Sequence, residues 1–193
     1  MFRVRFHGRG GQGVVTAAEM LAVAAFIDDL HAQAFPSFGS ERMGAPVVSY
    51  CRVDNRPIRT HDPVVSADAL VIQDATLLHE VDLFAGLDDS GFVLVNSART
   101  PRELGLDDLA QRLVPERLVT LPANDIGMRF LGRPRANTAL LAALASLSGV
   151  VSHQAVVEAI RRRFPGPVGE SNAAAADAAF DAVADRREVA GRA

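Results

Sequence analysis

The residue types best suited to chemistry gather near the amino terminus, in the glycine-rich segment 7–13. Gly8, Gly10 and Gly13 have the GxGxxG spacing of a dinucleotide-binding turn, which lets a ligand approach the backbone closely. A helix that starts after this turn would offer unpaired N–H groups and a positive dipole end to an anion. The segment therefore predicts an anion or phosphate site. We assign six residues to it: Gly8, Arg9, Gly10, Gly11, Gln12 and Gly13.

A second candidate segment, residues 38–46, is rich in glycine and charge. It follows a predicted strand, so we expect it at the same sheet edge as the glycine-rich segment, where doubly wound folds bind ligands. Arg42 offers a guanidinium that can pair with an anion through two hydrogen bonds, and Glu41 can orient that guanidinium or an arginine of a partner. Ser40, Glu41 and Arg42 therefore join the candidate site.

Two other interpretations of the glycine-rich segment stay open at this stage. A stand-alone NAD(P)-dependent dehydrogenase would need an acidic residue at the end of the second strand, about 20 residues downstream, to bind the ribose. Asp28 and Asp29 come too early for that role, which counts against this interpretation. A purely structural subunit would use the same glycines only to make a tight turn, with no ligand.

No catalytic set and no metal site is expected in this chain. Its five histidines have no metal-ligand spacing, and Ser40 and Ser97 have no evident base nearby. The single cysteine, Cys51, falls in a predicted strand, where a core position is more common than a nucleophile. One cysteine also excludes a disulfide framework and an iron–sulfur cluster held by this chain alone.

The composition argues against several further classes of function. All 20 basic residues are arginine, so a P-loop lysine, a Schiff-base lysine and a lysine general base are excluded. A net charge of −3 argues against binding to nucleic acid. No apolar run reaches the length of a membrane span, and the first residues do not resemble a signal peptide. We therefore expect no membrane association and a cytoplasmic location.

Hydrophobic patterning predicts alternating strands and helices in a single domain, residues 1–193. Strands are predicted at residues 2–7, 31–35, 46–53, 69–73, 92–96 and 118–121, and helices at residues 14–27, 77–84, 106–113, 137–148, 152–164 and 171–188. This order is typical of an α/β, Rossmann-like fold with a mostly parallel sheet, helices on both faces and a helical C-terminal part, residues 137–188. A turn at Asp54 and Asn55 predicts a hairpin to residues 56–59, which would make the sheet mixed. The alanine-rich helices are expected to pack flat faces on partner subunits.

The two candidate segments together resemble the gamma subunit of 2-oxoacid:acceptor oxidoreductases, the thiamine-diphosphate and iron–sulfur enzymes that include pyruvate:ferredoxin oxidoreductase. Further matching segments occur in order along nearly the whole chain, at residues 74–78, 95–97, 136–141 and 158–165. Met43 departs from the family pattern, because many members have a second arginine or a glycine at that position.

The resemblance implies an enzyme that decarboxylates a 2-oxoacid on thiamine diphosphate, passes electrons to iron–sulfur clusters and transfers the acyl group to coenzyme A (CoA). This chain would be a non-redox subunit, inactive alone, that covers the active site and helps to bind CoA through the candidate residues. Thiamine diphosphate, Mg²⁺ and the clusters would belong to alpha, beta and delta-type, ferredoxin-like subunits, through which ferredoxin or an NAD-linked acceptor would dock. The substrate stays open among pyruvate, branched-chain 2-oxoacids, phenylglyoxylate, indolepyruvate and 2-oxoglutarate.

Overall fold

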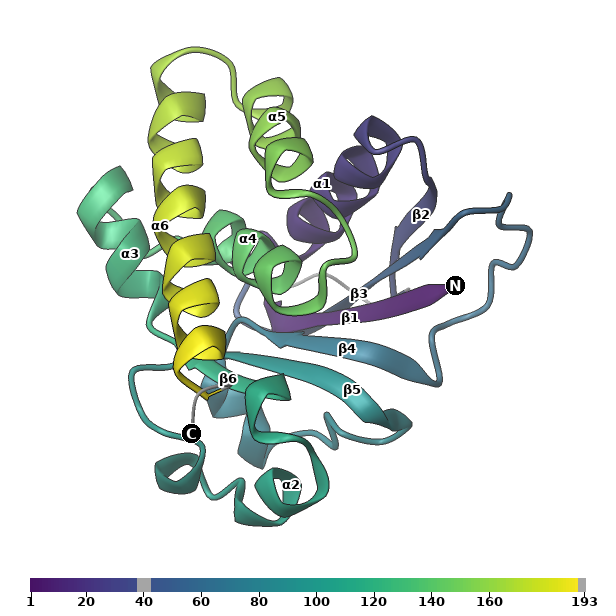
Figure 1. The fold of residues 1–193 in the computed structure, drawn as a ribbon, viewed down its shortest axis with the longest axis vertical. Helices are drawn as coiled ribbons and strands as arrows, with labels where there is room; N and C mark the ends of the chain where they lie inside the picture. The colour runs from purple at the N-terminus through teal and green to yellow at the C-terminus, as the bar shows by residue number, and fades with distance from the viewer. Residues whose placement is uncertain (38–42, 191–193) are drawn as a thin grey trace.

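A six-stranded sheet in the order β2-β3-β1-β4-β5-β6 forms the centre of the described part of this computed structural model (Figure 1). The structure describes the backbone of residues 1–37 and 43–190, and the side chains of residues 1–37 and 43–185. The strands are β1 (Phe2–Arg9), β2 (His31–Pro36), β3 (Pro46–Asp54), β4 (Ala67–Ile72), β5 (Leu87–Asn96) and β6 (Leu118–Leu121). The α-helices are α1 (Val14–Ile27), α2 (Asp107–Arg112), α3 (Ala123–Leu131), α4 (Asn137–Ser148), α5 (His153–Arg163) and α6 (Pro167–Ala190). Short 3₁₀ helices form η1 (Ala75–His79), η2 (Arg102–Leu104) and η3 (Pro115–Arg117).

The strand directions make the sheet mostly parallel. β1 pairs with β4, β4 with β5 and β5 with β6 in parallel, whereas β3 runs antiparallel to both of its neighbours, β1 and β2. The prediction of an α/β fold with a mostly parallel, mixed sheet is confirmed. Because β2 points the same way as β1, the carboxyl ends of β1, β2 and β4 lie at one edge of the sheet.

The predicted hairpin between residues 46–53 and 56–59 is wrong. β3 does contain residues 46–53, but it pairs with β1 on one side, where Cys51 faces Val4, and with β2 on the other. Residues 56–59 form no strand. Both edges of β3 are already occupied, and Pro57 lacks the N–H group that a strand ladder needs. A further strand therefore has no edge of β3 on which to pair.

Alternating side chains of the sheet supply two separate cores. On one face, Phe6 and Val71 pack against α1, α3, α4, α5 and α6. On the other face, Ile72 and Val95 pack in a smaller core with Leu109 of α2 and with residues of η1. Figure 1 shows α1, α4, α5 and α6 above the sheet and α2 below it. Helices on both faces and a helical C-terminal part are thus confirmed, with layers of unequal thickness.

The alanine-rich helix α4 lies in the middle of the larger core. Ala139, Ala142 and Ala143 are fully buried, and α4 packs against α6, α5 and α1. Small side chains let these helices approach closely, so the chain itself buries the alanine-rich faces of α4. The expectation that such faces pack on partner subunits is therefore wrong for this helix.

Three helices differ from the predicted pattern. The hydrophobic pattern misses α3, which has Gly127 in its middle and proline at its N-cap. The predicted helix 77–84 is instead the short η1, whose N-cap Asp74 accepts a hydrogen bond from the N–H of Thr76. α6 begins at Pro167, ahead of its predicted start, because proline is favoured at the first helical position.

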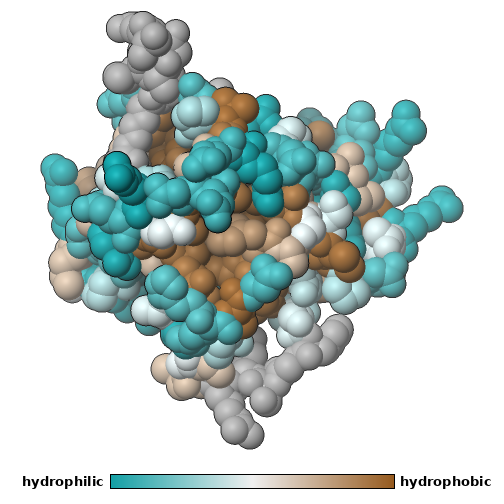
Figure 2. Space-filling view, turned by 90° about the horizontal axis from the view of Figure 1, so that it is seen from below, coloured by the Kyte–Doolittle hydropathy of each residue, from teal (hydrophilic) through white to brown (hydrophobic). Residues whose placement is uncertain are grey.

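One face of the molecule carries an apolar area bordered by hydrophilic residues (Figure 2). Exposed apolar side chains occur in the segments that follow η1 and α2, at Val81 and Val114, and ahead of β4, at Val65. Such exposed apolar surface is typical of contact with another protein. In the part of the chain that the structure describes, no helix is both long and apolar enough to cross a membrane.

Candidate functional site

The glycine turn, residues 8–13, links the end of β1 to the start of α1. Gly11 and Gly13 have φ angles of +91° and +78°, in the left-handed region that glycine adopts without strain. Gly8 is needed for a different reason, because a Cβ there would lie 2.6 Å from Cγ2 of Val14. These glycines let the helix begin close against the strand, as the spacing predicts.

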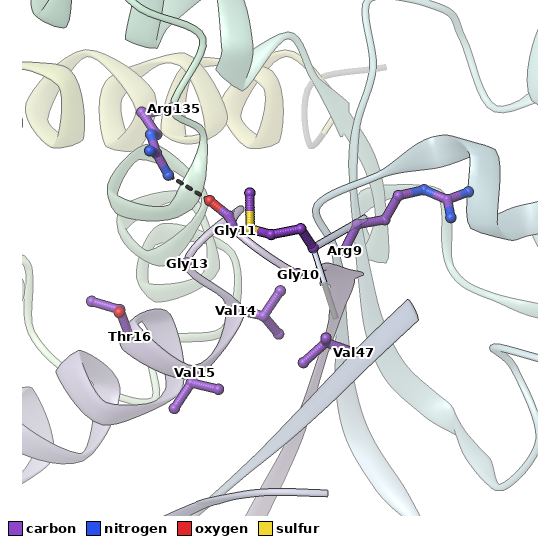
Figure 3. A pocket seen from close by; sticks show the side chains of 10 residues that line it. Arg9, Gly10, Gly11, Gly13, Val14, Val15, Thr16, Val47 and Arg135 are labelled. Carbon is purple, nitrogen blue, oxygen red and sulfur yellow. Dashed lines mark hydrogen bonds between the residues drawn. The ribbon is translucent and has the colours of Figure 1, made fainter. Parts of the chain in front are cut away.

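The start of α1 is open to a ligand. Its N-cap, Gly13, has no side chain that accepts the first N–H groups, and the first turn contains no acidic residue. The dipole of this 14-residue helix places partial positive charge at those N–H groups. A cavity of about 410 Å³ lies against the turn (Figure 3). Its walls are formed by Arg9, Gly10, Gly11, Gly13, Val14, Val15, Thr16, Met43, Val47 and Arg135.

Arg9 lies at the turn, but its guanidinium points away from Gly11 and Val14 (Figure 3). It donates hydrogen bonds to Glu80 at 2.5 Å and to Thr76 at 2.6 Å, and its Nε lies 3.3 Å from a carboxylate oxygen of Asp74. Two carboxylates thus offset its charge. Arg9 holds the end of β1 against η1, and binding an anion would require it to leave these partners.

Gln12 also fixes the shape of the turn. Its Oε1 accepts the N–H of Arg9 at 2.7 Å, and its Nε2 donates to Asp74 at 2.7 Å. Burial acts to raise the pKa of Asp74, but hydrogen bonds from Thr76 and Gln12, with the charge of Arg9, hold that pKa below its usual value. Asp74 is therefore ionised at neutral pH and anchors both Gln12 and Arg9.

A cation that does face the turn is Arg135, which the motif analysis missed. Its Nη1 donates to the carbonyl oxygen of Gly11 at 2.6 Å (Figure 3). Gly127 of α3 permits this position, because a Cβ there would lie 2.3 Å from the carbonyl oxygen of Arg135. The available signal in the sequence was the pair Arg133 and Arg135, immediately ahead of the matching segment 136–141.

The second candidate segment reaches the glycine turn, at the predicted sheet edge. The N–H of Gly10 donates to the carbonyl oxygen of Ala45 at 2.9 Å, and Gly10 forms an isolated parallel bridge with Met43. The Met43 side chain lies close to Gly11, since a Cβ on Gly11 would be 2.9 Å from Cε of Met43. Three predicted site residues lie outside the described residues: Ser40, Glu41 and Arg42.

Two reactive residue types lie away from the cavity. His7 is buried on β1, where burial, with a further effect from the charge of Arg5, lowers its pKa to about 4. Cys51 is fully buried in the larger core, as predicted, and burial raises the pKa of its thiol. Among the described residues, no group of three or more His, Cys, Asp or Glu side chains is arranged to hold a metal ion.

Comparisons with known proteins agree with this architecture. Residues 3–182 match the family model described as pyruvate ferredoxin/flavodoxin oxidoreductase. The "Pyruvate/ketoisovalerate oxidoreductases common subunit gamma" of Pyrococcus furiosus is 46% identical over 181 residues, which cover 94% of this chain and 96% of that protein. The "Pyruvate synthase subunit PorC" of Methanothermobacter marburgensis is 43% identical over 181 residues, which cover 94% and 97%.

Solved structures share the fold. The pyruvate oxidoreductase subunit PORC from Thermotoga maritima superposes with a TM-score of 0.78 at 30% identity, covering 93% of this chain and 95% of that one. The 2-oxoglutarate:ferredoxin oxidoreductase from Magnetococcus marinus, solved with 2-oxoglutarate, CoA and succinyl-CoA bound, has a TM-score of 0.71 at 18% identity, over 96% of this chain and 31% of that one.

The fold, the glycine turn and these matches define an α/β subunit of an oxidoreductase complex. The chain belongs to the pyruvate ferredoxin/flavodoxin oxidoreductase family. Within that family it is a gamma-type subunit of a pyruvate or 2-oxoacid:ferredoxin oxidoreductase complex. The resemblance predicted from the glycine-rich segments is thereby confirmed.

Proposed function

We propose that this chain is a non-redox gamma subunit whose complex converts a 2-oxoacid to acyl-CoA and CO₂, and that it covers the active site and holds part of CoA. The observation that carries the CoA role is a cavity of about 410 Å³ that lies between the open start of α1 and Arg135. The guanidinium of Arg135 has no acidic partner among the described residues. Backbone N–H groups and arginine are the groups that bind phosphate in a chain without lysine.

A relative's name supports a role in handling CoA rather than in choosing the 2-oxoacid. The Pyrococcus furiosus protein is named as a subunit common to pyruvate and ketoisovalerate oxidoreductases. If enzymes with different 2-oxoacid substrates share a subunit, that subunit is expected to act in a step that their reactions have in common. Transfer of the acyl group to CoA is such a step, and CoA is bound in the Magnetococcus marinus enzyme that shares this fold.

Each part of the site would have a limited task. The N–H groups at the start of α1 and the side chain of Arg135 would bind phosphate oxygens of CoA. Gln12 and Arg9 would keep the turn in shape through Asp74. From the second segment, Ser40, Glu41 and Arg42 are proposed as further contacts. Thiamine diphosphate, Mg²⁺ and iron–sulfur clusters on alpha, beta and delta-type subunits would supply decarboxylation and electron transfer, in the cytoplasm.

The subunit role is tested by comparing the chain alone with its native complex. Each preparation receives a 2-oxoacid, CoA, thiamine diphosphate and a viologen dye, and dye reduction is measured. We expect reduction by the complex and none by the chain alone, because the chain has one cysteine and no group that could carry the redox step. Turnover by a clean preparation of the chain alone would overturn the proposal.

The CoA role is tested with Arg42→Ala in the assembled complex. Losing one charge-assisted bond to a phosphate should raise the KM for CoA about ten- to a hundredfold. Decarboxylation of the 2-oxoacid without CoA serves as the control and should keep its rate. An unchanged KM for CoA would remove Arg42 from the site. If neither Arg42→Ala nor Arg135→Gln changes the KM for CoA, the chain is a purely structural subunit that does not hold CoA.

A further inference from the structure

A second cavity, of about 220 Å³, lies beside the one at the glycine turn. The two cavities share Gly13, Thr16 and Arg135. The second is bounded by the start of α1, the segment that joins α3 to α4, and the facing ends of α4, α5 and α6. Its walls are formed by Gly13, Thr16, Leu131, Arg133, Arg135, Asn137, Arg163, Phe164 and Asn172.

Three arginines of this cavity have no acidic partner among the described residues. In residues 1–37 and 43–185, the side chains of Arg133 and Arg163 form no ion pair or hydrogen bond, and the Arg135 side chain donates only to the carbonyl oxygen of Gly11. The neighbouring arginines of α5 behave differently, since Arg161 pairs with Glu170 and Arg162 with Glu158, each within 2.9 Å. Three like charges that line one cavity, with no acidic partner among the described residues, favour the binding of an anion.

Asn137, at the start of α4, gives independent support for a ligand. The residue is only 8% exposed, and its side-chain amide has no hydrogen bond to any described residue, so the amide is open to the cavity that it lines. Its Nδ2 lies beside Gly13, 2.7 Å from where a Cβ on that glycine would be. An amide in this position can donate to an oxygen of a molecule bound in the cavity. Nearby Asn172, by contrast, accepts a hydrogen bond from Thr138 at 3.1 Å and donates to Val168 at 2.8 Å.

We propose that Arg133, Arg135, Arg163 and Asn137 form a binding subsite for a phosphate monoester group. This inference rests on the proposed function and deepens it. CoA carries a diphosphate and a separate 3′-phosphate, and the two cavities joined at Gly13 and Arg135 offer one place for each. The diphosphate is assigned to the glycine turn. The dianionic 3′-phosphate is assigned to the arginine cavity, because planar guanidinium groups match phosphate oxygens through two hydrogen bonds.

The test compares CoA with dephospho-CoA, which lacks the 3′-phosphate, in the assembled complex. The wild type should have a KM for dephospho-CoA about tenfold or more above that for CoA. Arg163→Gln and Arg133→Gln should each raise the KM for CoA about tenfold and leave that for dephospho-CoA unchanged. Arg162→Gln is the matched control, because it removes the same charge one residue away, outside the cavity. It should change neither value.

Direct binding to the full chain gives a second measurement. Calorimetry with adenosine 3′,5′-bisphosphate should detect binding to the wild type and to Arg162→Gln, and a loss of binding in Arg163→Gln. Equal KM values for the two cosubstrates, or equal effects of Arg163→Gln and Arg162→Gln, would overturn the subsite and leave the proposed function standing. If no acyl-CoA forms in the complex, the proposed function fails, and the calorimetry alone decides whether the phosphate subsite exists.

Discussion

The guanidinium of Arg135 donates a hydrogen bond to the carbonyl oxygen of Gly11 at 2.6 Å, although 124 positions separate the two residues along the chain. This bond ties the segment between α3 and α4 to the glycine turn. Arg9 belongs to the turn itself, yet it is held by Glu80 and Asp74. The arginine that is close in sequence therefore stabilises the turn through its carboxylate partners, and the arginine that is distant in sequence has no acidic partner among the described residues.

The two arginines should differ in their effect on CoA. In the assembled complex, Arg135→Gln should raise the KM for CoA about ten- to a hundredfold, because one charge-assisted contact is lost. Arg9→Gln should change it by less than about threefold, since two carboxylates already offset the charge of Arg9. Steady-state kinetics with varied CoA measure both values. Equal effects of the two substitutions would contradict this assignment.

Gly13 should tolerate a side chain less well than Gly149, another glycine with positive φ. Gly149, at the end of α4, has φ of +67° and no atom within 4 Å of a Cβ, so Gly149→Ala should cost only the left-handed strain, about 1–2 kcal/mol. Gly13→Ala adds a contact of 2.7 Å with the buried Asn137, and should lower the free energy of unfolding by about 1–3 kcal/mol more. Urea unfolding of the full chain measures both.

A double variant separates strain from steric overlap at this position. Asn137→Ala combined with Gly13→Ala removes the overlap and should recover much of the additional loss, compared with Asn137→Ala alone. If Gly13→Ala and Gly149→Ala lower the free energy of unfolding by the same amount, the contact with Asn137 adds nothing to the cost of a side chain at residue 13.

His7 should make the chain less stable in acid. Its pKa in the folded chain is about 4, below the usual value of 6.5, so the unfolded chain takes up a proton first as the pH falls. The stability contributed by neutral His7 is complete above pH 6.5 and is lost between pH 6.5 and pH 4, by about 3 kcal/mol at most. Urea unfolding at several pH values should show a flatter dependence for His7→Leu than for the wild type. If the free energy of unfolding depends on pH in the same way for both proteins, the prediction is contradicted.

Cys51 should not react in the native chain. Its side chain is fully buried, and burial raises the pKa of the thiol, so the reactive thiolate is scarce as well as inaccessible. A chromogenic disulfide reagent should label no thiol under native conditions and one thiol per chain in guanidinium. Rapid labelling of the folded chain would show that β3 opens readily or that the thiol is exposed.

The strands and the glycine turn could be predicted because their signals are local. The alternation of apolar residues in β1 and β3 and the glycine spacing at 8–13 depend only on neighbouring positions. The partners of β3 could not be predicted in this way. The same alternation suits a hairpin with residues 56–59 or insertion between β1 and β2, and only tertiary packing decides between them.

The candidate site shows the same limit. Gly8 and Gln12 were found because they belong to a motif, whereas Arg135 reaches the turn through the packing of α3. That helix is short, and its Gly127 lowers the helix propensity of the segment, so the sequence pattern hides it. The glycine is nevertheless what lets the backbone of residue 135 come close. A residue that weakens the local signal is thus required by the long-range contact.

The helical layers on the two faces of the sheet differ in size, which implies that the two sides of the chain do not unfold locally with equal ease. The layer with α2 rests on the smaller core and consists of short elements, whereas α4 is enclosed by other helices on the opposite face. Local unfolding requires least free energy where few apolar contacts are lost. Amide hydrogens of α2 should therefore exchange with solvent long before those of α4 and β1, so that this side of the sheet can rearrange while the larger core stays packed.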